Sequence, residues 1–309
     1  MSNHGYENGR LDLPFVGIST FGKRPYVADW SAIDADVAII GAPFDFGTQF
    51  RPGARFGPRA MREQSILTGE FEFGLWPWDY HIAEHHTVID YGDICNFVGY
   101  PERMIDVLEK TVDEILISDT ACFSMGGDHF ISLPLLRAHV RKHGPLALVH
   151  FDAHSDTWVD EDYHHGTMFY HAIKEGLLDI KHSIHVGLRT PNPETHGIEI
   201  IFADELDELK ASEVAERIKK RVGDNKAYLT FDIDFLDPAY APGTGTPVSG
   251  GPTVIKGRKI LKGLSGLNVV GGDLVEIAPA YDPIGNITAV AGATLGGDIL
   301  YLISEALRR

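Results

Sequence analysis

The chain of 309 residues is long enough for one large domain or two small ones with a sizeable buried core. It carries 27 Lys and Arg residues against 44 Asp and Glu residues, so its formal charge is −17. This charge argues against binding DNA or RNA, which requires a basic face, and is compatible with cationic substrates or metal ions.

Hydrophobic periodicity predicts alternating strands and helices after a polar N-terminal arm over residues 1–30. In chain order, the expected elements are a strand at 36–42, helices at 57–65 and 104–117, a strand at 120–124, a helix at 134–142, strands at 145–151, 183–187 and 198–202, a helix at 212–222, a strand at 226–231, a helix at 254–263, a strand at 268–277 and a closing helix at 288–307. Gly292, Gly296 and Gly297 are expected to interrupt the closing helix.

This alternation indicates an α/β fold with an open, mostly parallel sheet that helices cover on both faces. No linker, repeat or low-complexity segment divides the chain, so we expect a single domain. Ligands of such folds bind at the C-terminal ends of the strands. Residues that carry chemistry are therefore expected directly after the apolar strands.

The cysteine content and the N-terminus bear on the compartment of the protein. Cys95 and Cys122 make no disulfide framework, which favours a reducing compartment and a cytoplasmic location. The first residues have neither the basic nor the apolar region of a signal peptide. No apolar run approaches the roughly 20 residues of a membrane-spanning helix, so no membrane partner is expected.

The segment Asp152-Ala-His154-Ser-Asp156 follows the predicted strand at 145–151 directly. If the chain stays extended there, residues two positions apart point the same way, and the three ionisable side chains converge. A solvated loop is the alternative interpretation. Because the motif adjoins a buried strand, a metal site is favoured.

Asp232 and Asp234 follow the strand at 226–231 in the same arrangement. One such pair is a weak indication, because it also occurs in turns and helix caps, but two strand ends of this kind in one parallel sheet are a much stronger one. Several carboxylates in one place repel one another, and a divalent metal ion usually compensates the charge.

His129 closes the segment Gly126-Gly127-Asp128-His129 after the strand at 120–124. Alone it is more often structural, but beside the other two strand ends it is interpreted as a ligand. Two histidines and four aspartates exceed one tetrahedral zinc site and suit two ions that share carboxylates. Oxygen-rich ligation with imidazole favours ions like Mn²⁺, while Ni²⁺, Co²⁺ and Fe²⁺ remain possible. Such a pair lowers the pKa of water, which indicates metal-assisted hydrolysis.

Three further residues have polar side chains that the predicted site can use. Glu276 lies in the apolar strand at 268–277 and needs a cationic partner there. That partner is either an internal arginine or a planar cationic substrate, which carboxylates bind in a bidentate manner. His164 and His165 lie in the loop after residue 156, where a histidine either shuttles protons or is merely solvated.

These motifs, in this order, resemble the ureohydrolase family of arginases, agmatinases and related guanidino hydrolases. The matching segments are RPGARFGP at 51–58, GGDH at 126–129, DAHSD at 152–156, DIDFLDPAYAPGTGTPVSGG at 232–251 and EIAP at 276–279. The resemblance runs from about residue 36 to the C-terminus. It implies one ureohydrolase domain over residues 1–309, a three-layer α/β/α sandwich of the arginase and deacetylase type with a parallel sheet of about eight strands.

The resemblance also implies two Mn²⁺ ions per subunit, with Ni²⁺ as the alternative. It assigns four residues to one ion (His129, Asp152, Asp156 and Asp232) and four to the other (His154, Asp152, Asp232 and Asp234), with Asp152 and Asp232 bridging. Hydroxide attack on a guanidinium carbon then releases urea and an amine. In this mechanism Asp156 orients the hydroxide and passes on a proton, Glu276 holds the guanidinium group and His165 relays protons. Only the resemblance favours His165 over His164.

Within the family, the loop after residue 156 sets the substrate. The polar loop of arginases is missing, and the segment 165–169 (HGTMF) is similar to agmatinases. This loop also contains three acidic residues, Asp160, Glu161 and Asp162. Their carboxylates are either merely solvated or attract the distal ammonium group of agmatine. Agmatine, hydrolysed to putrescine and urea, is therefore the expected substrate. Trp158 and the aromatic segment 71–80 depart from the usual agmatinase pattern. The alternative substrates are therefore guanidinobutyrate, free guanidine and alkylated guanidines, and some relatives that act on such substrates use nickel.

Three other functions are disfavoured. The segment 242–251 resembles a phosphate loop but fits neither nucleotide-binding pattern. Deacetylases share the general fold but use one zinc and lack the histidine of GGDH. A non-catalytic subunit of a hetero-oligomer has no reason to keep six ligands. Family members are commonly trimers or hexamers, so a homo-oligomer that binds a small cationic guanidino substrate is expected.

Overall fold

One parallel sheet of eight strands organises the computed structural model, which describes residues 16–27, 34–68, 76–95, 100–192 and 194–309. Its strand order is β2-β1-β3-β8-β7-β4-β5-β6, and every neighbouring pair is parallel. Residues 1–15 and 28–30 of the expected N-terminal arm lie outside the described residues.

The inner strands are short apolar runs that are buried on both faces, as parallel sheets require, whereas the edge strands β2 and β6 are partly exposed. The strands are β1 Val37–Ala42, β2 Val88–Asp93, β3 Ala121–Gly126, β4 Ala147–Phe151, β5 Ile184–Leu188, β6 Glu199–Phe202, β7 Lys226–Asp232 and β8 Asn268–Val275. All strands expected from the sequence form, but β8 ends two residues before the predicted position. Strand β2 was not predicted, because polar residues interrupt its apolar pattern. One of them, Asp90, is buried against Arg62 with a nitrogen–oxygen distance of 2.8 Å.

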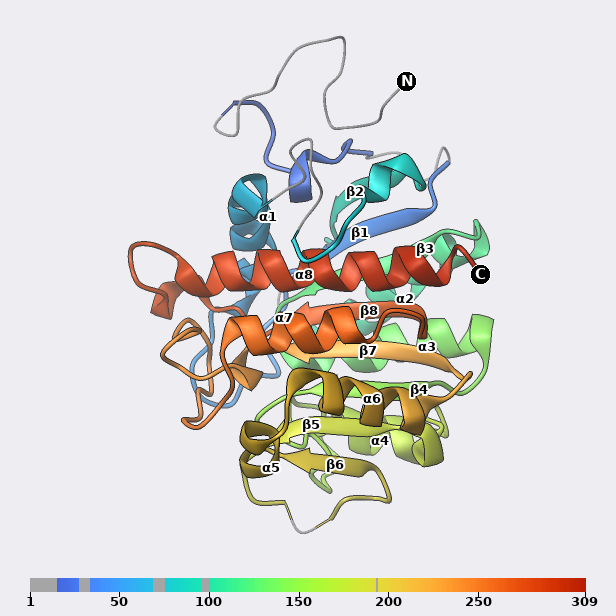
Figure 1. The fold of residues 1–309 in the computed structure, drawn as a ribbon. Helices are drawn as coiled ribbons and strands as arrows, with labels where there is room; N and C mark the ends of the chain where they lie inside the picture. Colours follow the sequence, from blue (N-terminus) through green and yellow to red (C-terminus); the bar gives the residue numbers. More distant parts are fainter. Residues whose placement is uncertain (1–15, 28–33, 69–75, 96–99, 193) are drawn as a thin grey trace.

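Helices cover both faces, so the predicted three-layer α/β/α arrangement is confirmed (Figure 1). One layer contains α1 Gly57–Thr68, α6 Ala211–Val222, α7 Val254–Gly263 and α8 Ile287–Ala306, and the other contains α2 Pro101–Ile117, α3 Ser132–His143 and α4 Met168–Lys174. The short helix α5 (Ala203–Glu208) follows β6. A separate cluster of buried apolar side chains lies on each face of the sheet. Helices α4 and α5, seven and six residues long, were not predicted because such short helices show little periodicity.

Helix α8 is continuous, so the expected interruption at its glycines is wrong. A Cβ atom at Gly292 would lie 2.1 Å from Cδ1 of Ile277, and one at Gly296 would lie 3.1 Å from the ring of Phe123. The glycines therefore let the helix pack closely on the sheet, which offsets their cost of about 1 kcal/mol each. From the sequence we expected no apolar run long enough to span a membrane. Helix α8 is long and apolar enough to do so, but 78% of the 18-residue apolar stretch within it is buried in the fold.

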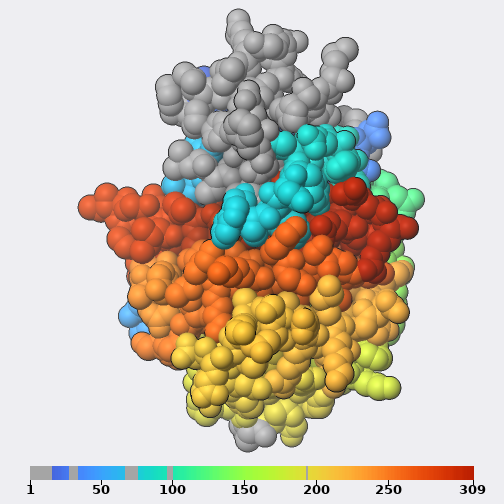
Figure 2. All heavy atoms as spheres, viewed as in Figure 1, coloured from blue at the N-terminus to red at the C-terminus, as the bar shows by residue number. Residues whose placement is uncertain are grey.

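The segment after residue 75 lies across α8 (Figure 2), and Trp78 holds it there through a hydrogen bond to a buried carboxylate of that helix. The ring of Trp78 stacks on Tyr301 with a centroid distance of 4.8 Å, and its Nε1 donates to Oδ1 of Asp298 at 2.8 Å. Nε of Arg258 donates to Oδ2 of the same carboxylate at 2.8 Å. Asp298 thus joins α8, α7 and the crossing segment.

We expect the substitution Asp298→Ala to lower the free energy of unfolding by about 3–5 kcal/mol, because it leaves the buried Arg258 cation without its carboxylate. The matched control is Glu63→Ala, which breaks the exposed pair with Arg59 and costs at most about 0.5 kcal/mol. Urea unfolding followed by circular dichroism measures both. Equal losses in the two variants would contradict this account of the buried pair.

Candidate metal centre

Four adjacent strands bring polar side chains to one edge of the sheet. In spatial order these strands are β3, β8, β7 and β4. Each is followed or ended by one of the residues singled out in the sequence, namely His129, Glu276, Asp232 and Asp152. Because the strands are parallel, their C-terminal ends lie side by side, and residues up to 147 positions apart in the chain meet there.

The segment after β4 turns instead of staying extended, so the predicted route by which its side chains converge is wrong. The strand ends at Phe151, and Oδ1 of Asp152 accepts a hydrogen bond from the backbone N–H of His154 at 2.6 Å. Asp156 then adopts a left-handed conformation with φ 52°. Aspartate tolerates this conformation better than most residues. The turn brings Asp152 and Asp156 to the same place although strand periodicity is lost.

The end of β7 repeats this device. Asp232 is the last residue of the strand, and its Oδ1 accepts from the backbone N–H of Asp234 at 2.8 Å. A single turn of 3₁₀ helix, Ile233–Phe235, follows. This turn places Oδ2 of Asp234 3.0 Å from Nδ1 of His154. The two aspartates therefore face different parts of the same cluster.

Three carboxylate oxygens surround Nδ1 of His129. The distances are 3.0 Å to Oδ2 of Asp152, 2.9 Å to Oδ2 of Asp156 and 3.3 Å to Oδ2 of Asp232. Nε2 of the same ring lies 2.8 Å from the hydroxyl of Thr230, which donates its own proton to Asp273, so Nε2 carries the ring proton. Nδ1 is buried and has no hydrogen-bond partner of good geometry. An imidazole nitrogen and three oxygens thus point at one position, as metal ligands do.

A second group lies on the other side of Asp152. Nδ1 of His154 is 3.5 Å from Oδ1 of Asp152 and 3.0 Å from Oδ2 of Asp234. The ligand atoms of these three residues lie within 4.8 Å of one another. Asp152 offers Oδ2 to the first group and Oδ1 to the second. The buried His/Asp cluster therefore fits a binuclear metal site with a shared carboxylate.

The charges of this cluster require compensation. Burial and the neighbouring Asp152 charge raise the pKa of Asp156 to about 7. Burial and the charges of Asp234 and Asp152 likewise raise the pKa of Asp232 well above its usual value. Without added positive charge, these carboxyl groups hold protons at neutral pH. Divalent metal ions can take the place of those protons, because they are cations that bind hard oxygen ligands such as carboxylates.

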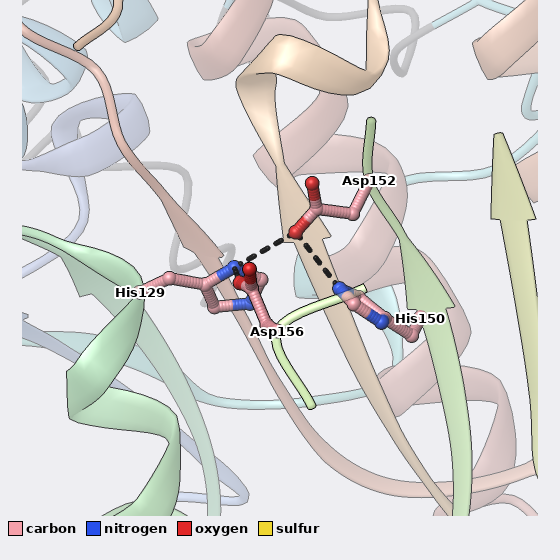
Figure 3. A group of neighbouring side chains, drawn as sticks. All are labelled: His129, His150, Asp152 and Asp156. Atoms are coloured by element: carbon pink, nitrogen blue, oxygen red, sulfur yellow. Dashed lines mark hydrogen bonds and ion pairs between the residues drawn. The ribbon is translucent and has the colours of Figure 1, made fainter. Parts of the chain in front are cut away.

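His150 belongs to the same cluster and was missed by the sequence analysis (Figure 3). It lies in β4, and its Nε2 is 2.9 Å from Oδ2 of Asp152. Burial lowers its pKa, so the ring is neutral and donates a proton to the carboxylate. Its position two residues before Asp152 on one strand was the available indication, since such residues share a face.

Glu276 is buried directly after β8 in a left-handed conformation with φ 65°. Its Oε1 accepts from the backbone N–H of His129 and lies 2.9 Å from Nδ1 of His165. The arginine that one interpretation required is not among these partners. Oε2 is buried and has no hydrogen-bond partner. A strained backbone and an unpaired buried carboxylate oxygen are features of residues that bind a ligand.

His165 and its neighbour His164 differ clearly in their surroundings. Burial disfavours the charged His165 ring, but the carboxylate of Glu276 outweighs it and raises the pKa of His165 to about 9. The backbone N–H of His165 donates to the carbonyl of Gly47 at 3.1 Å, which links its loop to the loop after β1. In contrast, Nδ1 of His164 only accepts from the backbone of Gly166, and burial lowers its pKa.

A cavity of about 400 Å³ opens above this cluster. Asp156 and Asp232 of the cluster line it, as do Trp158, Val159 and Asp160 of the loop that follows Asp156. Among the described residues that line it there is neither a lysine nor an arginine. Of the three acidic loop residues, only Asp160 borders the cavity, since Glu161 instead pairs with Lys174 at 2.8 Å.

Comparisons with known proteins agree with this geometry. The model of the arginase family matches residues 35–301. An agmatinase from Photorhabdus laumondii is 48% identical over 276 residues, which are 89% of each chain. The solved structure of a protein described as a hypothetical agmatinase from Burkholderia thailandensis has a TM-score of 0.93 at 42% identity, over 100% of this chain and 99% of that one.

A second solved structure is similar over nearly the same length. Proclavaminate amidino hydrolase from Streptomyces clavuligerus has a TM-score of 0.88 at 37% identity, over 96% of this chain and 100% of that one. The matched region of the family model contains all strands and the whole cluster at their C-terminal edge. The chain therefore belongs to the arginase family, the ureohydrolases that its motifs resemble.

Proposed function

We propose that this ureohydrolase cleaves agmatine to putrescine and urea. The observation that carries the proposal is the buried, unpartnered Oε2 of Glu276 beside a His/Asp cluster that fits two metal ions. A guanidinium group supplies planar N–H donors for such an oxygen. The agmatinase relatives support agmatine as the source of that group.

The resemblance to ureohydrolases assigns the residues that would hold the two ions, and the two groups around Asp152 support these assignments except that of Asp232 to the second ion. One ion is assigned to His129, Asp152, Asp156 and Asp232, and the other to His154, Asp152, Asp232 and Asp234. The oxygen-rich donor set favours Mn²⁺, with Ni²⁺ as the alternative. When bound, such ions lower the pKa of water and so supply hydroxide at neutral pH.

The protein side chains position the substrate and move protons. Glu276 accepts guanidinium N–H groups at Oε2, while the hydrogen bonds from His129 and His165 hold Oε1 in place. This fixes the guanidinium carbon over the cluster and Asp156. Asp156 orients the nucleophile and passes a proton to the leaving nitrogen. His165, beside Glu276, relays protons between the cavity and solvent.

The cavity suits a cationic tail. Trp158 and Val159 offer apolar surface to a methylene chain, and the carboxylate of Asp160 attracts an ammonium group at its end. The carboxylate of guanidinobutyrate would meet Asp160 with neither a lysine nor an arginine among the described lining residues, so it is disfavoured. Free guanidine and alkylated guanidines would use Glu276 but gain nothing from Asp160.

We expect the Mn²⁺-loaded protein to release urea from agmatine with kcat/KM on the order of 100-fold above the value for arginine or guanidinobutyrate. The reason is that a substrate carboxylate facing Asp160 without a partner costs several kcal/mol. A colorimetric urea assay measures the rates, and the chelator-treated protein is the metal-free control. Higher kcat/KM with guanidine or methylguanidine, tested with both Mn²⁺ and Ni²⁺, would overturn agmatine as the substrate, and inactivity with every metal would overturn the catalytic assignment.

The substitution Glu276→Gln should lower kcat/KM for agmatine by about 100-fold or more, because the neutral amide leaves the bound guanidinium cation without its charge partner. Bound metal, measured by elemental analysis, should stay unchanged. Glu175→Gln is the matched control, since Glu175 pairs with Arg137 outside the cavity. Full activity of the Glu276 variant would remove this residue from the guanidinium site.

We also propose one domain over residues 1–309, a cytoplasmic location and a homo-oligomer, trimer or hexamer. Both cysteines are free thiols, which is compatible with a reducing compartment. Exposed apolar side chains such as Phe50, Phe56 and Ile284 offer surface for contacts between subunits. Light scattering of the purified protein tests the oligomer, and a monomer at assay concentration would contradict it.

A further inference from the structure

Two buried histidines lie behind the cluster and have no part in the mechanism above. His150 of β4 and His185 of β5 are direct partners in the parallel register of the two strands. Their rings stack with a centroid distance of 4.2 Å. Both rings are almost fully buried, so each contact that they make is made inside the protein.

Both histidines hold Asp152, the carboxylate that the two groups share. Nε2 of His150 lies 2.9 Å from Oδ2 of Asp152, and because a carboxylate oxygen only accepts, the imidazole donates. Nε2 of His185 donates to the backbone carbonyl of Asp152 at 3.1 Å. The side chain and the main chain of one residue are thus fixed by two neighbouring strands.

The oxygen that His150 contacts is the one that faces His129. Oδ2 of Asp152 is 3.0 Å from Nδ1 of His129, so it lies between the two rings (Figure 3). One lone pair of Oδ2 accepts from His150, and the other remains for an ion beside His129. Oδ1 accepts from the backbone N–H of His154 and keeps its other lone pair for the second group. The hydrogen bond from His150 therefore sets the rotation of the carboxylate that lets it serve both positions.

His150 also lies close enough to the cluster to be considered as a ligand. The hydrogen bonds distinguish the two roles. Nδ1 of His129 has no hydrogen-bond partner of good geometry, whereas Nε2 of His150 has one, the oxygen of Asp152. To bind an ion through Nε2, His150 would have to release Asp152. The contacts of His150 therefore fit a residue that donates a hydrogen bond to a metal ligand, Asp152, better than a residue that binds the ion itself.

We propose that His150 is a positioning residue that holds Oδ2 of Asp152 toward the ion beside His129, with His185 supporting both residues from the next strand. This inference rests on the binuclear centre proposed above. Partners that orient a metal ligand typically change metal affinity by about 10- to 100-fold when they are removed.

The test compares three variants of the full chain. His150→Phe keeps a flat ring but removes the donor, and His150→Gln keeps an N–H donor near the position of Nε2. His171→Phe is the control, because His171 is buried in α4 and its Nε2 has no hydrogen-bond partner. Mn²⁺ binding is followed by isothermal titration, ligation by the absorption spectrum of the Co²⁺ protein, and turnover by urea release.

For His150→Phe we expect affinity for at least one Mn²⁺ to fall by about 10- to 100-fold. Its Co²⁺ spectrum should keep the intensity that reports an unchanged number of ligands. At saturating Mn²⁺, kcat should fall while KM for agmatine stays the same, since Glu276 is untouched. His150→Gln should recover most of the affinity, and the control should match the wild type.

Two results would overturn the inference while leaving the proposed function intact. Wild-type affinity in His150→Phe would mean that the hydrogen bond does not position Asp152. A Co²⁺ spectrum that reports one ligand fewer in this variant would make His150 a ligand instead. A wild-type protein that binds fewer than two ions would remove the binuclear centre itself, and this inference with it.

Discussion

The burial of several carboxylates at one edge of the sheet is the constraint on which the rest of the site depends. Asp152, Asp156, Asp232 and Asp234 lie within a few residues of strand ends and are almost inaccessible to solvent. Burial and the neighbouring carboxylates raise the pKa values of Asp156, Asp232 and Asp234 and so disfavour their charged forms. A stable charged cluster therefore needs cations, and the imidazoles of His129 and His154 complete a donor set for them.

The strand order makes this concentration of charge possible. The neighbouring strands β3 and β8 are far apart in the sequence, as are β7 and β4, so four separate loops converge without any long excursion of the chain. A hydrogen-bonded turn after each of β4 and β7, rather than extended backbone, aims the carboxylates. Glu276 then connects the centre to the cavity wall, because its Oε1 binds both the backbone of His129 and the ring of His165.

Contacts behind the centre are as specific as those within it. Nε2 of His129 is held by Thr230, and Asp152 is held by His150 and His185. Such contacts leave the metal-facing atoms of His129 and Asp152 free in one defined orientation. The contacts of His129 and His165 with Oε1 of Glu276 leave its Oε2 unpaired, and so available to a ligand.

The sequence by itself determined the layered α/β class, seven of the eight strands and the residues that gather at the strand ends, because apolar runs followed by Asp and His are local patterns. It could not determine the turns at Asp152 and Asp232, the left-handed backbone of Glu276 or the continuity of α8. These depend on contacts between distant segments, such as Gly292 against Ile277. Only the tertiary structure decided the role of His150 and the unpaired oxygen of Glu276, since hydrogen bonding and burial are properties of neighbours that the chain brings together by folding.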